Sequence, residues 1–452
     1  MPQVDSIIHK EKTFSNGSKV LVINTGAVIN PEAEAMLQAL HSRSIGGIKS
    51  HLKVLAEKGP EKFLSTYYVG YGHKSIGDCG TCTIFIENVS MFTAKAIQDW
   101  PLYSGQEAST RYIEFAKQKF VDPIGTIKSK KILEDWRAFY LKGLSELDVF
   151  LKEKFPLNPG ESENMYNKAI KARAFDIMRG FLPAGASTNL AWHTNFRQAA
   201  DHLMRLRHHP LEEVRETARA IEETLNEAFP SSFGHEKFKK TEEFNKRWMA
   251  DNYYYEQNKG VDFKLTKNLV DKKSLKKYKN FLKSRPIKTE LPKELSELGS
   301  LQFEFLLDFG SFRDIQRHRA VIQRMPLLVT KHGFENWYID ELPKHLQTEA
   351  VKFLSKQEKL ISSLKCSPEI RQYYIAMGYK LPNRLTGSLP AILYLAELRA
   401  TRFVHPTLRK RAGEIAQTLL KEFGPCGLTL HLDDDPDRFD VKRGSHDIIK
   451  KT

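Results

Sequence analysis

Apolar and polar positions follow two periods through the first part of the chain. Residues 19–24 (Lys-Val-Leu-Val-Ile-Asn) predict a buried strand, and residues 31–43 predict a helix with its apolar side chains on one face. Residues 81–87 alternate between apolar and polar positions, which is typical of a half-buried strand. Ser90 then stands where a helix N-cap belongs, before residues 91–100, whose helical pattern ends at a proline.

Helical patterns dominate the stretch that follows. Residues 129–155, 164–179 and 195–207 predict helices, and a Leu-Pro-Ala-Gly break at 182–185 separates the last two. An apolar stripe at helical spacing in residues 211–225 indicates a helix that packs on a core. Strands and helices in this order predict an α+β fold.

The second part of the chain repeats the first. Residues 303–316 align with residues 85–98 without a gap, and the break at 182–185 is echoed by Leu381-Pro382. The matching residues further on are Leu203, Leu206, Arg207, His209, Pro210, Arg215, Ala218, Ile221 and Leu225 in the first part, and Leu395, Leu398, Arg399, His405, Pro406, Arg409, Ala412, Ile415 and Leu419 in the second. Helical spacing alone would not repeat Leu-Arg followed by His-Pro, so we predict a divergent tandem duplication.

The duplication predicts the domain organisation. We expect a first repeat at residues 1–235, a basic linker at 236–259, a second repeat at 260–435 and a charged tail at 436–452. Each repeat should have a small, mostly antiparallel sheet with packed helices, and the two should be arranged as a pseudo-dimer.

Charge and cysteine content narrow the class of protein. The chain has 452 residues, and 70 Lys and Arg against 55 Asp and Glu give a net charge of +15, which favours anionic partners such as nucleotides, phosphorylated cofactors or nucleic acid. The four cysteines include one Cys-x-x-C pair, Cys79 and Cys82, without a second pair or clustered His to complete a zinc site. We therefore expect no metal, no membrane segment and a reducing, cytoplasmic location.

Residues 106–112 (Gln-Glu-Ala-Ser-Thr-Arg-Tyr) combine groups that bind small anions. Ser109 and Arg111 are two positions apart, so an extended or turning backbone can direct both at one phosphate. Taken alone, this segment is typical of a solvated loop, and Arg317-His318-Arg319 is typical of a basic helix end.

Together, these segments resemble a known family. The order Gly-His-x-Ser, strand, helix, Arg-His-Arg, Ser-x-Arg-Tyr, Leu-Pro and Leu-Arg resembles the flavin-dependent thymidylate synthases. Those enzymes are normally homotetramers of one such unit. Because this chain carries two such units, the resemblance implies a homodimer of chains that is equivalent to the tetramer.

The resemblance implies a role for each matching residue. The residues implied to bind deoxyuridine monophosphate are Ser104, Ser109, Arg111, Tyr112 and Arg179. Glu107 belongs to the same motif and is counted with the catalytic residues, and the arginine that contacts the uracil ring corresponds to Arg205 or Arg207. The residues implied to contact flavin or its surroundings are His73, Ser75, Arg317, His318, Arg319 and Arg399.

Each repeat lacks part of the family motif that the other retains. The first repeat has Asp99-Trp100-Pro101 where the second has Arg-His-Arg, and the second has Ile322, Leu327 and Val329 where the first has Ser, Ser and Arg. Gly378 is the expected counterpart of Arg179. We therefore expect composite sites, formed by both repeats, that methylate deoxyuridylate to thymidylate with FAD, methylene-tetrahydrofolate and NADPH.

Two alternatives stay open. A relative that has lost flavin chemistry would bind a nucleotide without catalysis. A basic nucleic-acid-binding protein would use the linker lysines and stack bases on Tyr253, Tyr254 and Tyr255; this alternative ranks last.

Overall fold

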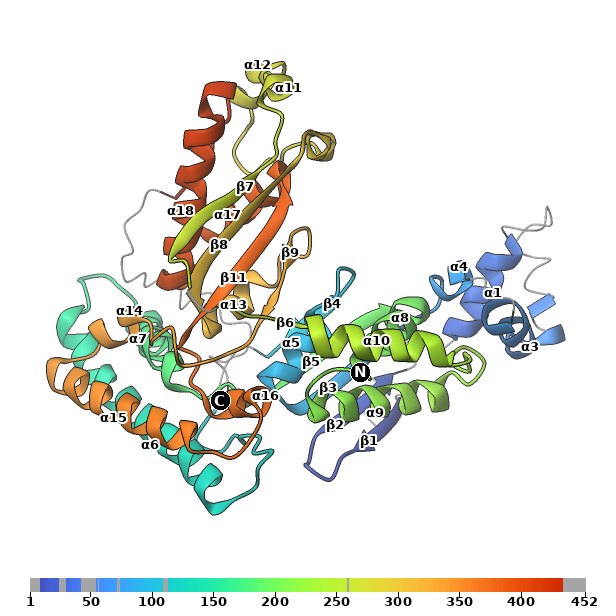
Figure 1. Ribbon diagram of the computed structural model, residues 1–452, viewed down its shortest axis with the longest axis horizontal. Helices are drawn as coiled ribbons and strands as arrows, with labels where there is room; N and C mark the ends of the chain where they lie inside the picture. The colour runs from blue at the N-terminus through green and yellow to red at the C-terminus, as the bar shows by residue number, and fades with distance from the viewer. Residues whose placement is uncertain are drawn as a thin grey trace. The chain divides into compact units, whose positions relative to one another are not determined.

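The computed structural model describes residues 9–23, 30–41, 54–55, 57–70, 74–108, 113–257 and 260–433. The chain divides into two compact units that are interleaved along the sequence (Figure 1). Residues 1–113 and 187–253 form the first unit, and residues 114–186 and 254–452 form the second.

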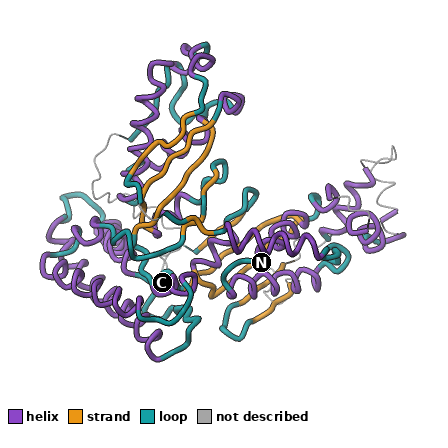
Figure 2. The backbone as a smooth tube through the Cα atoms, in the orientation of Figure 1, coloured by secondary structure: helices purple, strands orange, loops and turns teal. Residues whose placement is uncertain are grey.

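A five-stranded antiparallel sheet is the centre of the first unit (Figure 2). In spatial order its strands are β1 (His9–Thr13), β2 (Lys19–Ile23), β3 (Thr81–Ser90), β5 (Ser187–Asn195) and β4 (Ser104–Glu107). Cys82, Ile84 and Ile86 of β3 are fully buried, whereas the residues between them are partly exposed. This alternation directs one face of the strand into the core.

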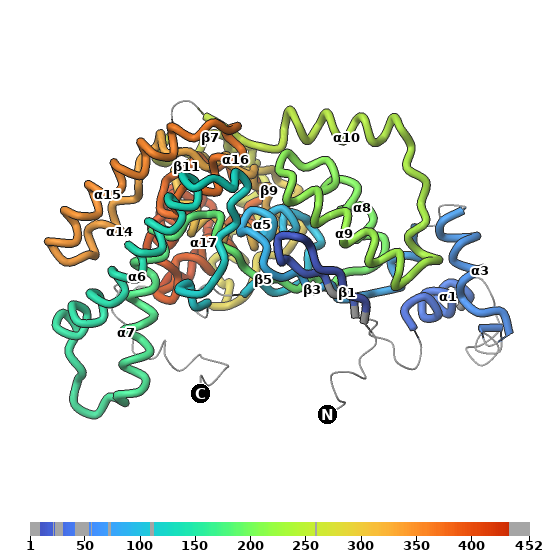
Figure 3. The backbone as a smooth tube through the Cα atoms, turned by 90° about the horizontal axis from the view of Figure 1, so that it is seen from below, coloured from blue at the N-terminus to red at the C-terminus, as the bar shows by residue number. Residues whose placement is uncertain are grey.

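The helices of the first unit are α1 (Pro31–His41), α5 (Met91–Gln98), α8 (Phe196–Leu206), α9 (Glu212–Ala228) and α10 (Lys239–Asn252), with the short segments α3 (Glu61–Phe63), η2 (Leu64–Gly70) and α4 (Lys74–Gly77). Of these, α5, α8 and α9 pack on the sheet. Ser90 caps α5 as predicted, because its side chain accepts a hydrogen bond from the backbone N–H of Thr93. Helix α9 packs on β1 and β2, and α10 lies along α8 (Figure 3).

The second unit contains a four-stranded antiparallel sheet. Its order is β7 (Phe263–Asn268), β8 (Ser300–Asp308), β11 (Lys380–Ser388) and β9 (Ile322–Gln323), and a separate parallel pair joins β6 (Tyr254–Tyr255) to β10 (Met325–Pro326). Its helices are α6 (Ile127–Lys154), α7 (Glu163–Met178), α11 (Lys272–Lys276), α12 (Lys279–Lys283), α13 (Phe309–Ile315), α14 (Asn336–Asp340), α15 (Lys344–Ser362), α16 (Pro368–Arg371), α17 (Leu389–Arg399) and α18 (Pro406–Phe423), with 3-10 turns η4 (Arg179–Phe181), η5 (Lys293–Leu298), η6 (Gln372–Tyr374) and η7 (Gly424–Cys426).

Residues 114–186 fold with the second unit although they lie within the predicted first repeat. Helix α6 packs on α7 and α15, and the rings of Phe139 and Phe353 stack with centroids 4.5 Å apart. Trp136 donates a hydrogen bond from its ring nitrogen to the carbonyl of Tyr374. The repeat boundaries near residues 235, 260 and 435 stay predictions.

The two sheets repeat one topology. The order β2-β3-β5-β4 of the first unit corresponds to β7-β8-β11-β9 of the second. A helix begins directly after β3 and after β8, capped by Ser90 and Asp308 respectively. The register also agrees, because Ser90 lies opposite Ser187 at the start of β5 and Asp308 lies opposite Lys380 at the start of β11. The predicted α+β fold with two similar units is confirmed.

One buried hydroxyl–carboxylate pair has exchanged its two positions between the repeats. In the first repeat Ser90 donates to Glu213 (Oγ to Oε2, 2.5 Å), and in the second Thr407 donates to Asp308 (Oγ1 to Oδ2, 2.6 Å). Ser90 and Asp308 are equivalent helix caps. Glu213 is the second residue of α9, and Thr407 is the second residue of α18. Each repeat keeps one donor and one charged acceptor at this contact, so a buried carboxylate is partnered in both.

Within the second unit, a local two-fold axis relates residues 179–185 to residues 372–378. Two pairs of backbone hydrogen bonds are reciprocal: Ala184 to Ile375 (2.9 Å) with Met377 to Leu182 (2.8 Å), and Gly185 to Tyr373 (3.0 Å) with Gly378 to Gly180 (2.7 Å). Pro183 and Ala376 face each other between them. The two segments come from different repeats, so here the repeats pair as expected for a pseudo-dimer.

Glycine is required on both sides of this axis. A Cβ atom at Gly185 would lie 2.6 Å from the carbonyl oxygen of Tyr373, and one at Gly378 would lie 2.9 Å from that of Gly180. Only residues without a side chain permit this backbone approach.

The structure corrects two predicted equivalences. Leu182-Pro183 corresponds to Ile375-Ala376, whereas Leu381-Pro382 lie inside β11. The counterpart of Arg179, the first residue of η4, is therefore Gln372, the first residue of η6, and not Gly378.

The repeated His-Pro is not equivalent either. His405 is the N-cap of α18, whereas the N-cap of α9 is Leu211, which lies after His209-Pro210. The same dipeptide occurs near the start of both helices, but each helix begins at a different distance from it. The two dipeptides are therefore not structurally equivalent.

The predicted linker contains a helix, α10, and two of the three tyrosines of its aromatic run, Tyr253 and Tyr255, are buried. Tyr253 packs on His209 in the first unit with ring centroids 4.3 Å apart. Tyr255, in the second unit, is buried beneath the guanidinium of Arg384, 4.6 Å from the ring centroid. Because these rings are not free to stack on bases, the nucleic-acid alternative loses its support. Among the described residues, no helix combines the length and apolar character needed to cross a membrane.

Candidate functional site

Three arginines gather around Asp314 in the second unit. Asp314 is in the last turn of α13, with Arg179 Nη1 3.5 Å from Oδ2 and Arg317 Nη2 3.7 Å from Oδ1. Arg399, the last residue of α17, donates to the backbone carbonyl of Asp314 at 2.9 Å. We call Arg179, Arg317 and Arg399 the arginine cluster; it combines one residue of the first repeat with two of the second.

Burial differs across the arginine cluster. The side chain of Arg179 is only 9% exposed, that of Asp314 is 28% exposed and that of Arg317 is 53% exposed. Burial alone would raise the pKa of Asp314, but Arg179, Arg317 and Arg399 outweigh it and lower that pKa to about 2. The carboxylate is therefore charged and partly open to solvent.

His318 lies between the arginine cluster and an exposed apolar surface. Its pKa falls to about 3 because the ring is buried and because Arg399 and Arg317 are near, so the ring is neutral. Nε2 of His318 accepts a hydrogen bond from Nε of Arg399 at 2.8 Å, which leaves the ring proton on Nδ1. On the other side the ring meets Tyr394 edge-on, with centroids 6.0 Å apart.

Tyr394 and Leu398 form an apolar shelf beside His318. They are one turn apart on α17 and are 41% and 44% exposed. Arg319, which follows His318, is exposed as well. The surface thus combines cations with exposed apolar side chains.

A buried polar network supports Arg179. Its Nη2 donates to Oγ of Ser311 at 3.0 Å, and Oγ of Ser311 lies 2.7 Å from Oγ1 of Thr407. Asp308 accepts from Thr407 and from the hydroxyl of Tyr338 (2.8 Å). These buried bonds fix the position of Arg179, so its guanidinium is held beside α13.

In the first unit, Arg205 and Arg207 have different surroundings. The guanidinium of Arg205 lies 6.0 Å from the ring centroid of Trp100, the residue at the repeat position of His318. Arg207 instead pairs with Glu242 through both Nε and Nη2, and with Glu222 (3.2 Å). Arg205 thus contacts Trp100 as Arg399 contacts His318, whereas Arg207 joins α8 to α10.

Glu107 is enclosed in the first unit. It pairs with Lys95 (Nζ to Oε2, 3.0 Å) and accepts from Gln98 (3.1 Å), and both charged side chains are almost completely buried. Ser104, at the start of β4, is exposed. Glu107 therefore acts first as the counter-ion of a buried lysine.

Several expected site residues cannot be placed. Ser109, Arg111, Tyr112 and His73 lie outside the described residues. Ser75 is exposed on the short helix α4.

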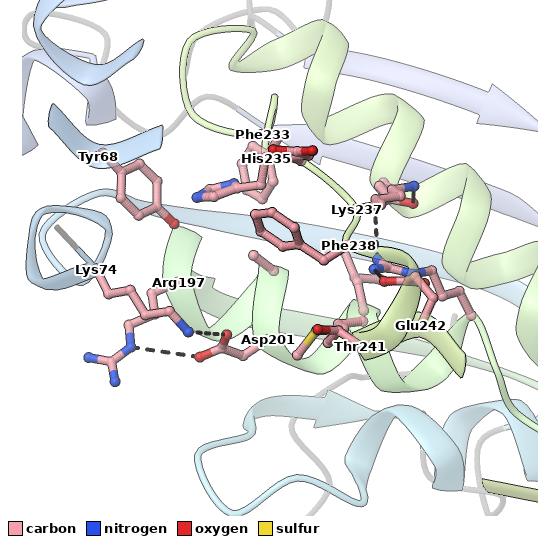
Figure 4. Close-up of a pocket in the computed structure, with 16 residues that line it drawn as sticks. Tyr68, Lys74, Arg197, Asp201, Phe233, His235, Lys237, Phe238, Thr241 and Glu242 are labelled. Atoms are coloured by element: carbon pink, nitrogen blue, oxygen red, sulfur yellow. Dashed lines mark hydrogen bonds and ion pairs between the residues drawn. The ribbon is translucent and has the colours of Figure 1, made fainter. Parts of the chain in front are cut away.

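A pocket of about 210 Å³ lies next to α4 in the first unit (Figure 4). Tyr68, His235 and Phe233 form an aromatic part of its wall, and Tyr68 and His235 meet edge-on at 4.8 Å. Asp201 pairs with Lys74 (3.2 Å) and Arg197 (3.7 Å) at one side. Glu242 and Lys237 lie at the other side, where Glu242 pairs with Arg207 and Lys237 pairs with Glu222.

Sequence reasoning missed Asp314 and the Asp308 network. The gapless alignment does distinguish Asp314. It is a carboxylate three residues before Arg317, and it stands opposite the uncharged Ala96 of the first repeat. The described residues contain no cluster of three His, Cys, Asp or Glu side chains suited to a metal ion.

Comparisons with known proteins agree with the motifs. The family model for thymidylate synthase complementing protein matches residues 16–231. A UPF0159 protein of Chlamydia muridarum is 24% identical over 413 residues, which are 79% of this chain and 78% of that protein. A UPF0159 protein of Thermoplasma acidophilum is 24% identical over 426 residues, which are 78% of this chain and 85% of that protein.

A solved structure also matches part of the chain. The UMP/dUMP methylase PolB from Streptomyces cacaoi, bound with 5-Br UMP, covers 45% of this chain and 87% of its own at 16% identity and a TM-score of 0.28. This similarity is too low to support an inference. The family match itself indicates a thymidylate-synthase-like methyltransferase. The resemblance to the flavin-dependent thymidylate synthases is therefore confirmed, over the residues 16–231 that the family model matches.

Proposed function

We propose that this protein methylates deoxyuridylate to thymidylate with bound FAD, methylene-tetrahydrofolate and NADPH, at composite sites formed by both repeats. The observation that carries the proposal is the arginine cluster. Arg179 of the first repeat and Arg317 and Arg399 of the second all contact Asp314. The family match to the first repeat supports the same reaction class.

The residues around His318 fit a flavin. Arg317 and Arg319 are exposed cations suited to a diphosphate, and the shelf of Tyr394 and Leu398 suits a flat ring. His318 is neutral and, with its proton on Nδ1, can donate a hydrogen bond. When bound, a reduced flavin supplies the hydride that completes the methyl group. Arg317 and Arg319 would hold its phosphates, and Arg399 would keep His318 in one tautomer.

The pocket beside α4 is a second candidate contact for the cofactor. Lys74 lines it and lies between His73 and Ser75, the two residues implied to contact flavin. Its aromatic wall and the paired charges of Lys74, Arg197 and Asp201 suit a ring with polar edges.

The nucleotide would be held by the first repeat. We propose that Ser104, Ser109, Arg111 and Tyr112 bind its phosphate and sugar. Arg205 is the better candidate than Arg207 for the uracil ring, because Arg207 already has two carboxylate partners.

The cysteines do not suggest a thiolate nucleophile. Burial raises the pKa of Cys82 to about 12 and also raises that of Cys79 and of Cys366. This agrees with methyl transfer that does not attach the pyrimidine to an enzyme cysteine.

A non-catalytic nucleotide-binding relative is the second candidate function. Two observations favour it: Asp314 already neutralises part of the arginine cluster, and Trp100 replaces histidine in the first repeat.

Stoichiometry and turnover test these proposals together. Flavin is quantified by absorbance in the purified protein, deoxyuridylate binding by calorimetry, and methyl transfer with labelled methylene-tetrahydrofolate. One flavin and one nucleotide per chain, with turnover, supports composite sites. Two of each per chain overturns them. Nucleotide binding without flavin or turnover supports the non-catalytic relative, and size-exclusion chromatography tests the expected homodimer.

A further inference from the structure

Asp314 occupies a position where a ligand anion would be attracted. Arg179 and Arg317 approach its carboxylate to 3.5 and 3.7 Å, which is within ion-pair range but longer than a well-formed hydrogen bond. Arg179 is nearly buried, and a buried cation needs a nearby negative charge. Asp308 and Asp176 are also near Arg179, but less strongly coupled to it than Asp314, and Asp308 already accepts from Tyr338 and Thr407.

The two repeats differ at both members of this pair. Asp314 corresponds to Ala96 in the gapless alignment, and Arg179 corresponds to Gln372 by its place in the 3-10 turn. Asp314 and Arg179 are thus charged residues whose counterparts in the other repeat are both uncharged.

We propose that Asp314 is a specificity-determining residue, an internal counter-anion that competes with phosphate groups for the arginine cluster. A ligand bound here meets Arg317 and Arg399 with one negative charge already present. The site therefore binds a phosphate less tightly than the same arginines would without Asp314. Replacing the carboxylate should convert the arginine cluster into a site for phosphate or diphosphate.

The inference rests on the proposed function only in taking the arginine cluster as a ligand-binding face. Its test uses inorganic pyrophosphate alone, so it needs no flavin, nucleotide or turnover. Loss of catalysis and failure of this inference are therefore distinguishable.

The experiment is calorimetric titration of the full chain with pyrophosphate. Asp314→Asn should bind at least about 10-fold more tightly than the unchanged protein, as expected when a neighbouring like charge is removed. The matched control is Asp262→Asn, which removes a carboxylate paired with the buried Arg411 (2.6 Å) in the same unit and should leave affinity unchanged. Adding Arg317→Ala to Asp314→Asn should abolish the gain.

A second variant covers loss of folding. Arg179→Gln with Asp314→Ala introduces the uncharged pair found at the corresponding positions and leaves no buried cation without a counter-ion. It should still unfold in one cooperative transition and bind pyrophosphate more tightly through Arg317 and Arg399. A folded Asp314→Asn or double variant that binds no tighter than the unchanged protein overturns the proposal, as does an equal gain in Asp262→Asn.

Discussion

Arg179 donates a hydrogen bond from Nη2 to Oγ of Ser311, 3.0 Å away, and this bond joins a residue of the first repeat to a helix of the second. Ser311 in turn contacts Thr407, which donates to the N-cap carboxylate of Asp308. The residue expected to hold a nucleotide is thus part of the polar interior of the second unit. Its substitution should affect stability as well as binding.

Arg179→Met should lower the free energy of unfolding by about 1–3 kcal/mol, because it removes the buried partner of Ser311 and Asp314. Urea unfolding followed by circular dichroism measures this. Lys142→Met, which removes a solvent-exposed ion pair with Glu349 in the same unit, should leave the midpoint almost unchanged. Equal midpoints for both variants would contradict the structural role of Arg179.

The exchanged hydroxyl–carboxylate pair can be tested by exchanging it again. Asp308→Ser alone should destabilise the protein by about 1–3 kcal/mol, since Thr407 and Tyr338 lose a charged acceptor. Asp308→Ser with Thr407→Glu recreates the arrangement of Ser90 and Glu213 and should recover at least about 1 kcal/mol. A double-mutant cycle by chemical denaturation gives the coupling; additive losses would show that the two contacts are not interchangeable.

Alanine substitutions of Arg205 and of Arg207 should have opposite effects on turnover and on thermal stability. Arg205→Ala should reduce turnover at least about 100-fold without changing the melting temperature, as for loss of a group that contacts the reacting base. Arg207→Ala should lower the melting temperature, because Glu242 and Glu222 each lose a partner, and should retain most activity. Turnover and thermal unfolding measured on both variants decide between them, and the reverse pattern would reassign the role.

Flavin and nucleotide should depend on different repeats. Arg317→Ala or Arg319→Ala should release flavin, while Arg111→Ala should retain it and weaken deoxyuridylate binding by about 1.5–3 kcal/mol. Absorbance after gel filtration and calorimetry measure the two. Lys352→Ala, at an exposed position of α15, is the control for loss of positive charge. Release of flavin by Arg111→Ala but not by Arg319→Ala would invert the assignment.

The attachment of α10 should weaken in acid. Hydrogen bonding from Arg207 lowers the pKa of Glu242 to about 2, so the folded pKa lies below the ordinary value near 4.5. The stabilisation is therefore fully present above about pH 4.5 and is lost as the pH falls towards 2. Fluorescence of Trp248 on α10, recorded between pH 5 and 2, should report the change. Glu242→Gln should show less change over this range; an identical titration would exclude Glu242 as its cause.

Capping residues and apolar periodicity predicted helices and strands close to their observed bounds. Ser90 caps α5 as predicted, and Asn195, the first residue of the helix predicted over 195–207, caps α8. The alternation in residues 81–87 identified β3, whose observed bounds are Thr81–Ser90. These features depend on a few neighbouring residues, so a single sequence contains them.

The interleaving of the compact units depends on contacts that no local pattern encodes. Trp136 bonds to the carbonyl of Tyr374, and nothing near either residue in the sequence specifies the other. The Leu-Pro echo at residues 381–382 was misleading for a similar reason, because a common dipeptide occurred inside β11. The family motif identified Arg317 and His318, but not that Asp314 would lie among the arginines.

The facing of Pro183 and Ala376 on the local two-fold axis has an evolutionary consequence. In a homodimer each substitution appears on both sides of such an axis, so a residue that suits one side is imposed on the other. Here one side has a proline without a backbone N–H and the other an alanine, while the reciprocal bonds around them are kept. When the two repeats are joined in one chain, each can accept substitutions independently, and one copy of each repeat is always present. One symmetric contact can then support two sites that differ in sequence.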